Sequence, residues 1–156
     1  MKHTTLCYLE RDGKYLMMHR VKKENDENRD KWIGIGGKME AGESPFDCAR
    51  REIREETGLT AEHLCYRGFI TFVSERYGTE YMHLFTAPCP AGTPRTDCPE
   101  GELAFIGKQA LYDLTLWEGD RLFLSLLDTE HRFFSLKLVY DDEGHLLSHE
   151  LEYAGL

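Results

Sequence analysis

The sequence contains no apolar run long enough to cross a bilayer, and its first residues, MKHTTLCYLERDGKYL, lack the hydrophobic region of a signal peptide. It also contains no CxxC pair, although it has five cysteines. An odd number of cysteines without such spacing fits reduced thiols better than a disulfide framework or a zinc site. These absences predict a cytoplasmic protein that does not insert into membranes.

Basic charge is also scarce. Nineteen lysine and arginine residues stand against 28 acidic residues, so the formal net charge is −9 at pH 7. This balance argues against broad binding to nucleic acids or anionic membranes, because both carry negative charge. A small phosphate-bearing ligand is still compatible if cations screen its charge. We therefore expect a bound metal ion in any site that holds a polyphosphate.

The arrangement of the chain predicts one domain, residues 1–156, since there is no internal repeat, low-complexity tail or evident linker. Strands are predicted at 4–10, 14–20, 65–74, 80–87, 103–107, 132–140 and 146–153. Helices are predicted from about 45 to 57 and from about 118 to 129. Strands and helices interleave without strict βαβ alternation, which indicates an α+β fold with a mixed central sheet flanked by helices.

Two segments are predicted to be loops. Residues 21–31, VKKENDENRDK, have little to bury and indicate a solvated, mobile loop, with a lid over a site as the alternative. Residues 88–101 hold four of the five prolines. Neither segment has the apolar periodicity of a helix or strand.

The first predicted helix has clear ends. Ser44 can act as its N-cap, Pro45 suits its first position, and Asp47 occupies the acidic position of a capping box. Gly58 then provides a C-terminal stop. The sequence therefore predicts a well-defined helix that begins directly after a glycine-rich stretch.

Three carboxylates, Glu52, Glu55 and Glu56, fall on one side of this helix within an arc of about 100°. Mg²⁺ prefers oxygen ligands and keeps several waters, so such carboxylates can hold the ion and leave positions for phosphate oxygens. The alternative is a solvated face, because arginines interleave with the glutamates and Arg51–Glu55 is an ordinary i, i+4 ion pair. The helix alone does not decide between them.

The spacing of residues around the helix decides the question. The pattern is a glycine, five residues, a glutamate, seven residues, Arg-Glu, an aliphatic residue, any residue, Glu-Glu, any residue, glycine and an aliphatic residue. It is met by Gly37, Glu43, Arg51, Glu52, Ile53, Glu55, Glu56, Gly58 and Leu59. This is the Nudix box, and the chain therefore resembles Nudix hydrolases.

The resemblance implies the α/β/α sandwich of that family and cleavage of a nucleoside diphosphate linked to another group. It implies that Glu52, Glu55 and Glu56 bind Mg²⁺ or Mn²⁺, with Glu55 or Glu56 as the base for the attacking water. It assigns structural roles to Gly37, Glu43, Arg51 and Gly58. In this arrangement Arg51 pairs with Glu43 and fixes the glycine-rich loop against the helix.

Similarity to the MutT group extends beyond the box, in KWIGIGGK (31–38) and LTLWEGDRLFLSLL (114–127). It implies that Glu102 assists the metal ions or the attacking water. It also implies substrate contacts from Arg20, Lys38, Trp117 and Asp120. From the residues alone, Trp117 is equally well a core residue, and Asp120 can cap the second helix.

Two positions depart from the human-type enzymes of this group. Ile33 stands where those enzymes have a base-reading asparagine, and Gly119 replaces one of two paired aspartates. We expect a nucleoside triphosphate pyrophosphohydrolase, a monomer or homodimer, that converts oxidised purine nucleotides such as 8-oxo-dGTP to the monophosphate and pyrophosphate. Another Nudix substrate, such as a nucleoside diphosphate sugar or a dinucleoside polyphosphate, is the nearest alternative. A non-catalytic nucleotide sensor is less favoured because the box is intact.

Overall fold

The structure is a computed structural model that describes residues 2–155. Its strands are β1 (Lys2–Arg11), β2 (Lys14–His19), β3 (Trp32–Ile33), β4 (Ile35–Lys38), β5 (Cys65–Ser74), β6 (Gly78–Pro88), β7 (Glu102–Gly107), β8 (Phe134–Tyr140) and β9 (Leu146–Tyr153). The helices are α1 (Pro45–Thr57), the short 3₁₀ helix η1 (Ala110–Asp113) and α2 (Glu118–Thr129).

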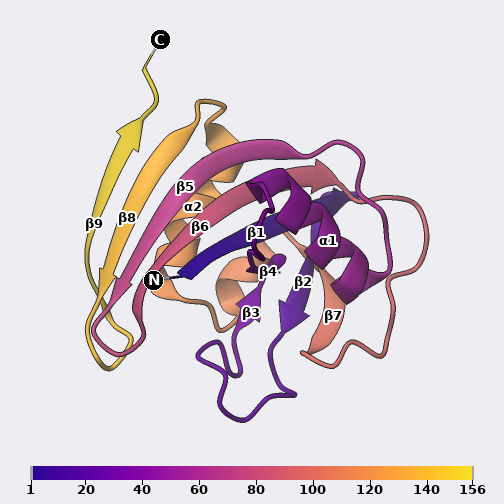
Figure 1. The fold of residues 1–156 in the computed structure, drawn as a ribbon, viewed down its shortest axis with the longest axis horizontal. Helices are drawn as coiled ribbons and strands as arrows, with labels where there is room; N and C mark the ends of the chain where they lie inside the picture. The colour runs from indigo at the N-terminus through magenta and orange to yellow at the C-terminus, as the bar shows by residue number, and fades with distance from the viewer. Residues whose placement is uncertain (1, 156) are drawn as a thin grey trace.

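The strands form one mixed sheet. Its main order is β3-β2-β1-β6-β5-β8-β9, while β4 also pairs with β1 and β7 with β2 (Figure 1). The β1–β6 and β5–β8 pairs are parallel, and the other pairs are antiparallel. The predicted mixed sheet with flanking helices is therefore confirmed.

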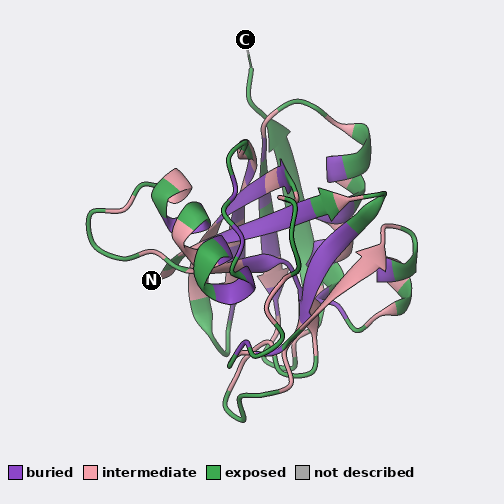
Figure 2. Ribbon diagram, turned by 90° about the vertical axis from the view of Figure 1, so that its right-hand side faces the viewer, coloured by how far each residue is buried: buried purple, intermediate pink, exposed green. Residues whose placement is uncertain are grey.

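The two faces of the sheet bury different helices. Along β1, Leu6 and Tyr8 belong to a core with Phe123 of α2, whereas Cys7 and Leu9 belong to a second core with Ile53 of α1. This follows from the alternation of side chains along a strand. The result is a sandwich with buried strands between the helices, as the colouring of Figure 2 shows.

Both predicted helices have the predicted bounds. Three elements were not predicted: β3, β4 and η1. The glycine-rich stretch was expected to be a loop, and its second half is strand β4, which pairs with β1. Gly36 is required there because a Cβ would lie 1.8 Å from the carbonyl oxygen of Thr5. Among the described residues, no helix is both long and apolar enough to cross a membrane.

Candidate active site

Helix α1 is fixed at both ends as its sequence predicts. The Ser44 hydroxyl accepts a hydrogen bond from the Asp47 backbone N–H at 3.1 Å, and the Asp47 carboxylate accepts one from the Ser44 N–H at 3.0 Å. At the other end, Gly58 has a left-handed φ of 76° that other residues rarely adopt. Ile53 and Ala49 bury one face of the helix. The glutamates are thereby held at fixed angles around the rest of it.

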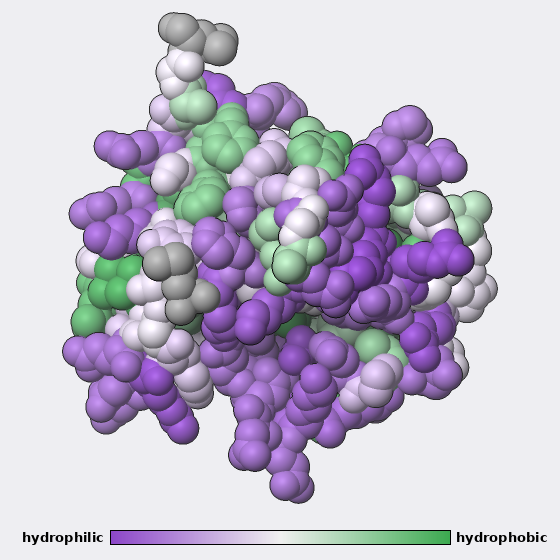
Figure 3. All heavy atoms as spheres, viewed as in Figure 1, coloured by the Kyte–Doolittle hydropathy of each residue, from purple (hydrophilic) through white to green (hydrophobic). Residues whose placement is uncertain are grey.

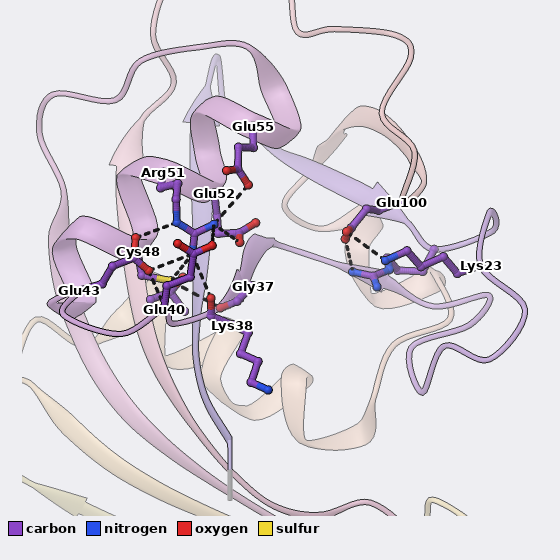
Figure 4. A network of polar contacts seen from close by, with 12 residues as sticks. Lys23, Gly37, Lys38, Glu40, Glu43, Cys48, Arg51, Glu52, Glu55 and Glu100 are labelled. Carbon is purple, nitrogen blue, oxygen red and sulfur yellow. Dashed lines mark hydrogen bonds and ion pairs between the residues drawn. The ribbon is translucent and has the colours of Figure 1, made fainter.

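Arg51 links this helix to the preceding loop and strand (Figure 4). Its guanidinium donates to both carboxylate oxygens of Glu43, at 2.7 and 2.9 Å, and to the carbonyl oxygen of Lys38 at 3.0 Å. It also donates to Glu52 at 2.8 Å and to Glu55 at 3.2 Å. The hydrogen bonds from Arg51 lower the pKa of Glu43 to about 2. The predicted Arg51–Glu43 pairing is therefore present.

Glu56 is the most unusual carboxylate of the helix. The residue is 4% exposed, and its Oε1 has no hydrogen-bond partner within residues 2–155. Burial, and then its contact with Glu52, raises the pKa of Glu56 well above its usual range. A buried carboxyl oxygen without a partner is energetically costly. A cation between Glu52 and Glu56 would remove that cost.

The backbone also approaches this position closely. A Cβ at Gly37 would lie 2.5 Å from the carboxyl carbon of Glu52, so no other residue fits there without moving Glu52. Glycine at this point of β4 thus keeps the Glu52 carboxylate against the sheet. Glycine is therefore needed at position 37 because a carboxylate approaches the backbone closely, and not because the chain must be flexible there.

The described residues contain no group of three or more potential ligands already gathered for a metal ion. Glu55 instead pairs with Arg51, and its side chain is 59% exposed. It has to turn away from Arg51 to join Glu52 and Glu56. A donor set made only of carboxylates suits a hard divalent cation such as Mg²⁺ or Mn²⁺.

A cavity of about 420 Å³ lies beside the helix. Of the residues predicted from sequence to form the site, it brings together Arg20, Gly37, Lys38, Glu52, Trp117 and Asp120. The predicted residues outside its lining are Glu43, Arg51, Glu55, Glu56, Gly58 and Glu102. The cavity therefore joins the carboxylate helix to the start of α2.

The end of the cavity near α2 is largely apolar. Trp117 is buried, with its ring edge-on to Phe72 and to Tyr140, so it belongs to the core as well as to the cavity wall. Asp120 is 4% exposed, and burial, followed by the charge of Glu80, raises its pKa to about 8. No side-chain hydrogen bond caps the start of α2, which argues against the capping interpretation of Asp120.

The side of the cavity formed by the β2–β3 loop carries basic groups. The Arg20 guanidinium lies 2.7 Å from Asp26 and 3.4 Å from Glu100, and Lys23 lies 3.1 Å from Glu100. In Figure 4, Lys23 and Glu100 face the glutamates of α1 from across the open site. Arg20 and Lys23 both line the cavity, and both are paired with acidic residues there.

The position of Glu102 does not support its predicted role. Glu102 is exposed at the start of β7, opposite His19, and it does not line the cavity. Glu100, two residues earlier, does line it. Both acids lie in one short stretch of sequence. The path of the chain before β7 decides which of them reaches the cavity.

The cavity contains further polar residues that the sequence did not indicate, namely Lys2, Thr4, Glu27, Asn28 and Glu80. One signal could have identified Glu80. It lies two residues before Met82 and four before Leu84 on β6, so an acidic residue occupies the same face as apolar ones.

The β2–β3 loop was expected to be solvated, with a lid as the alternative. It projects from the hydrophilic side of the molecule in Figure 3, yet it is attached at several points. Asn28 accepts a hydrogen bond from the Trp117 indole at 2.7 Å, Glu27 pairs with Lys2 at 2.8 Å, and Lys22 donates to the Cys98 carbonyl at 2.7 Å. The loop therefore forms one wall of the cavity.

Comparisons with known proteins agree with this geometry. The family model of the NUDIX domain matches residues 2–127. The oxidized purine nucleoside triphosphate hydrolase of Mus musculus is 32% identical over 78% of this chain and 77% of its own length. A Bacillus subtilis protein named as the uncharacterized Nudix hydrolase YvcI is 29% identical over 97% of this chain and 95% of its own.

A solved structure extends the likeness to the whole fold. The crystal structure of a MutT protein from Bacillus halodurans covers 97% of this chain and 98% of its own, with a TM-score of 0.86 and 26% identity. The similarity therefore includes β8 and β9, which lie beyond the residues matched by the family model.

Proposed function

The chain belongs to the Nudix family of hydrolases, enzymes that act on phosphoanhydride bonds, and on that premise we propose that it is a Mg²⁺-dependent nucleoside triphosphate pyrophosphohydrolase. Its proposed substrates are oxidised purine nucleotides such as 8-oxo-dGTP in the cytoplasm. The observation that carries the proposal is one cavity lined by Glu52 at one end and by Trp117 and Phe72 at the other. These two ends suit the phosphates and the base of one nucleotide.

The phosphate end has groups for metal binding, for phosphate binding and for proton transfer. Glu52, Glu55 and Glu56 would hold Mg²⁺ or Mn²⁺, which when bound neutralises phosphate charge and lowers the pKa of a bound water. Arg20 and Lys38 line the cavity, where they would contact the phosphates. Water attacks one phosphorus of the anhydride between the α- and β-phosphates, and the P–O bond of that anhydride breaks. The products are the nucleoside monophosphate and pyrophosphate. Glu55 or Glu56 takes the proton from the attacking water.

The acid outside the helix is best assigned to Glu100. The role was expected of Glu102, but Glu100 is the one that lines the cavity beside Arg20. Its charge also contributes to the raised pKa of Glu56, so the two carboxylates lie close enough to interact. Glu100 therefore orders Arg20 and Lys23 and adds negative charge near the metal position.

The base end offers aromatic surface and one neutral acid. Trp117 and Phe72 present aromatic surface, and base–aromatic contacts contribute roughly 1–3 kcal/mol each in other nucleotide-binding proteins. With a pKa of about 8, Asp120 keeps its proton at neutral pH. It can therefore donate a hydrogen bond to a base carbonyl, such as those of an oxidised purine.

The products formed from a panel of nucleotides with Mg²⁺ test this proposal. We expect pyrophosphate and a nucleoside monophosphate, with 8-oxo-dGTP among the preferred substrates. Release of two phosphorylated organic products from nucleoside diphosphate sugars or dinucleoside polyphosphates, without pyrophosphate from any triphosphate, would refute it. Tight binding of nucleotides without any turnover would indicate a sensor instead.

A further inference from the structure

Glu80 is a partly buried carboxylate on the floor of the cavity, and no step of the proposed reaction uses it. Its side chain is only 15% exposed. Its Oε2 accepts a hydrogen bond from the Thr4 hydroxyl at 2.7 Å, and its Oε1 lies 3.4 Å from the Lys2 ammonium. Lys2 is closer to Glu27, at 2.8 Å. A carboxylate accepts about four hydrogen bonds, so Glu80 still has acceptor capacity.

The order of the strands places Glu80 near the base end. Across the sheet, β4 is followed by β1, β6 and β5, and Glu80 of β6 pairs with Phe72 of β5. Neighbouring strands are about 4.8 Å apart, so Glu80 lies roughly 10 Å from the β4 strand and one strand from Phe72. The charge of Glu80 also raises the pKa of Asp120, so the two carboxyl groups lie close enough to interact. Glu80 is therefore a neighbour of the aromatic wall.

Other positions at this end provide little polar chemistry. Ile33 is apolar and nearly buried. A side chain larger than that of Gly119 is blocked, because a Cβ there would lie 2.5 Å from Leu138 and 2.7 Å from the Tyr140 hydroxyl. The Asn28 side-chain oxygen already accepts from Trp117. Asp120 and Glu80 are thus two carboxyl groups placed to meet a base, while Glu27, which also lines the cavity, is paired with Lys2 at 2.8 Å.

We infer that Glu80 is a specificity-determining residue that accepts hydrogen bonds from two adjacent N–H groups on the base, as on the N1–H and 2-amino edge of a guanine-type purine. The inference rests on the proposed function. A carboxylate matches such a donor pair in a bidentate arrangement. A base without one of the donors leaves Glu80 desolvated and incompletely bonded, which weakens its binding.

The two acids then have complementary roles. Glu80, held by Thr4 and Lys2, acts as the acceptor. Asp120, protonated at neutral pH, acts as a donor to a carbonyl oxygen of the same base. A guanine-type base carries both kinds of group on one ring system, whereas adenine has no carbonyl oxygen. The pair of acids therefore favours guanine-type bases.

A comparison of dGTP with dITP tests the inference, because inosine lacks only the 2-amino group. We expect wild-type protein to prefer dGTP by kcat/KM, on the order of tenfold to a hundredfold. Glu80→Gln should reduce that ratio to within about threefold of one, since the amide offers one acceptor oxygen and no charge. An unchanged ratio in a folded Glu80→Gln protein overturns the inference.

Three further variants separate base reading from a structural role. Glu10→Gln makes the same change at a carboxylate that pairs with Lys108, outside the cavity lining, and should keep the wild-type ratio. Lys2→Met removes the ion pair and leaves the Glu80 carboxyl group and its Thr4 hydrogen bond in place, so it too should keep the preference for dGTP. If Lys2→Met and Glu80→Gln have equal effects, Glu80 is a structural partner of Lys2 and the inference fails. If Glu80→Gln does not fold, Glu80→Ala, which removes both acceptor oxygens and the charge, replaces it with the same criterion.

Two outcomes distinguish this inference from the proposed function. Wild-type protein that releases pyrophosphate from dGTP, with a dGTP to dITP ratio that does not depend on Glu80, leaves the function intact and refutes the inference. Absence of pyrophosphate release from every triphosphate refutes both. A change in the ratio of GTP to dGTP, rather than of dGTP to dITP, assigns Glu80 to the sugar and also overturns the inference.

Discussion

At the scale of single residues, Glu56 and Glu55 are the two glutamates of α1 that differ most in burial. Glu56 is buried with an unpartnered oxygen, while Glu55 is exposed and held only by Arg51. Replacing either by glutamine keeps the shape and removes the charge. We predict that Glu55→Gln and Glu56→Gln each lower kcat by roughly 10²–10⁴. Circular dichroism should show an intact fold, and near-normal turnover in both variants would contradict the assignment.

Asp120 gives a residue-scale prediction for stability. Burial raises its pKa from 3.8 to about 8 on folding, so between these values the folded protein binds a proton that the unfolded chain has lost. The contribution of Asp120 to the free energy of unfolding therefore decreases as pH rises from about 4 to about 8, by up to ~1.4 kcal/mol per pH unit. Asp120→Asn should remove this contribution.

Urea unfolding at about pH 5 and about pH 9 measures the effect. We expect Asp120→Asn to gain stability relative to wild type at the higher pH. The same substitution at the exposed Asp142 serves as the control. If Asp120→Asn keeps the wild-type pH dependence, the buried carboxyl does not titrate in this range.

At the scale of elements, α1 and its loop are joined by one arginine. Arg51 connects Glu43, the Lys38 carbonyl and two glutamates of the helix. We predict that Arg51→Ala lowers the melting temperature by roughly 2–8 °C and also lowers turnover. The cause is loss of the contacts that fix the loop to the helix.

Arg54→Ala is the matched control for this prediction. Arg54 lies on the same helix, is exposed, and donates to Thr60 at 3.1 Å. Its removal should have a smaller effect on both measurements. Collapse of turnover in Arg51→Ala at an unchanged melting temperature would show that Arg51 takes part in the reaction directly.

The elements also show what the sequence could and could not predict. The bounds of α1 followed from Ser44, Pro45 and Gly58, because caps are local signals. Strand β4 was not predicted because glycines usually indicate a flexible loop. In the structure, glycine is needed at these positions because β1 and Glu52 lie too close for a larger side chain. That contact exists only in the folded sheet.

At the scale of the whole molecule, the part of the site that depends on contacts between distant segments could not be predicted from the sequence. The spacing of the box identified the glutamates of α1, which lie on one helix. Lys2 of β1 and Glu80 of β6 are distant in the chain and meet because β1 and β6 pair, whereas Glu100 reaches the same cavity through the segment before β7, which pairs with β2. No local pattern specifies these pairings, because strand pairing depends on contacts far apart in sequence.

The net charge of −9 adds a molecule-wide reason for the proposed metal dependence, because an acidic protein repels a triphosphate unless cations intervene. A cation that binds only the folded protein stabilises it, by about 2.7 kcal/mol at a hundredfold excess over its Kd. For a domain of this size we predict that Mg²⁺ raises the melting temperature by about 5–10 °C. Calorimetry against a NaCl solution of equal ionic strength measures it.

The same experiment on Glu56→Gln links this gain to the site. Without a cation, the raised pKa of Glu56 already favours the neutral carboxyl, and the amide is neutral too, so the melting temperature of the variant without Mg²⁺ should stay close to that of wild type. Its response to Mg²⁺ should be much smaller. An equal rise in both proteins would place the stabilising ions elsewhere on the acidic surface, since only a site that includes Glu56 makes the response depend on that residue.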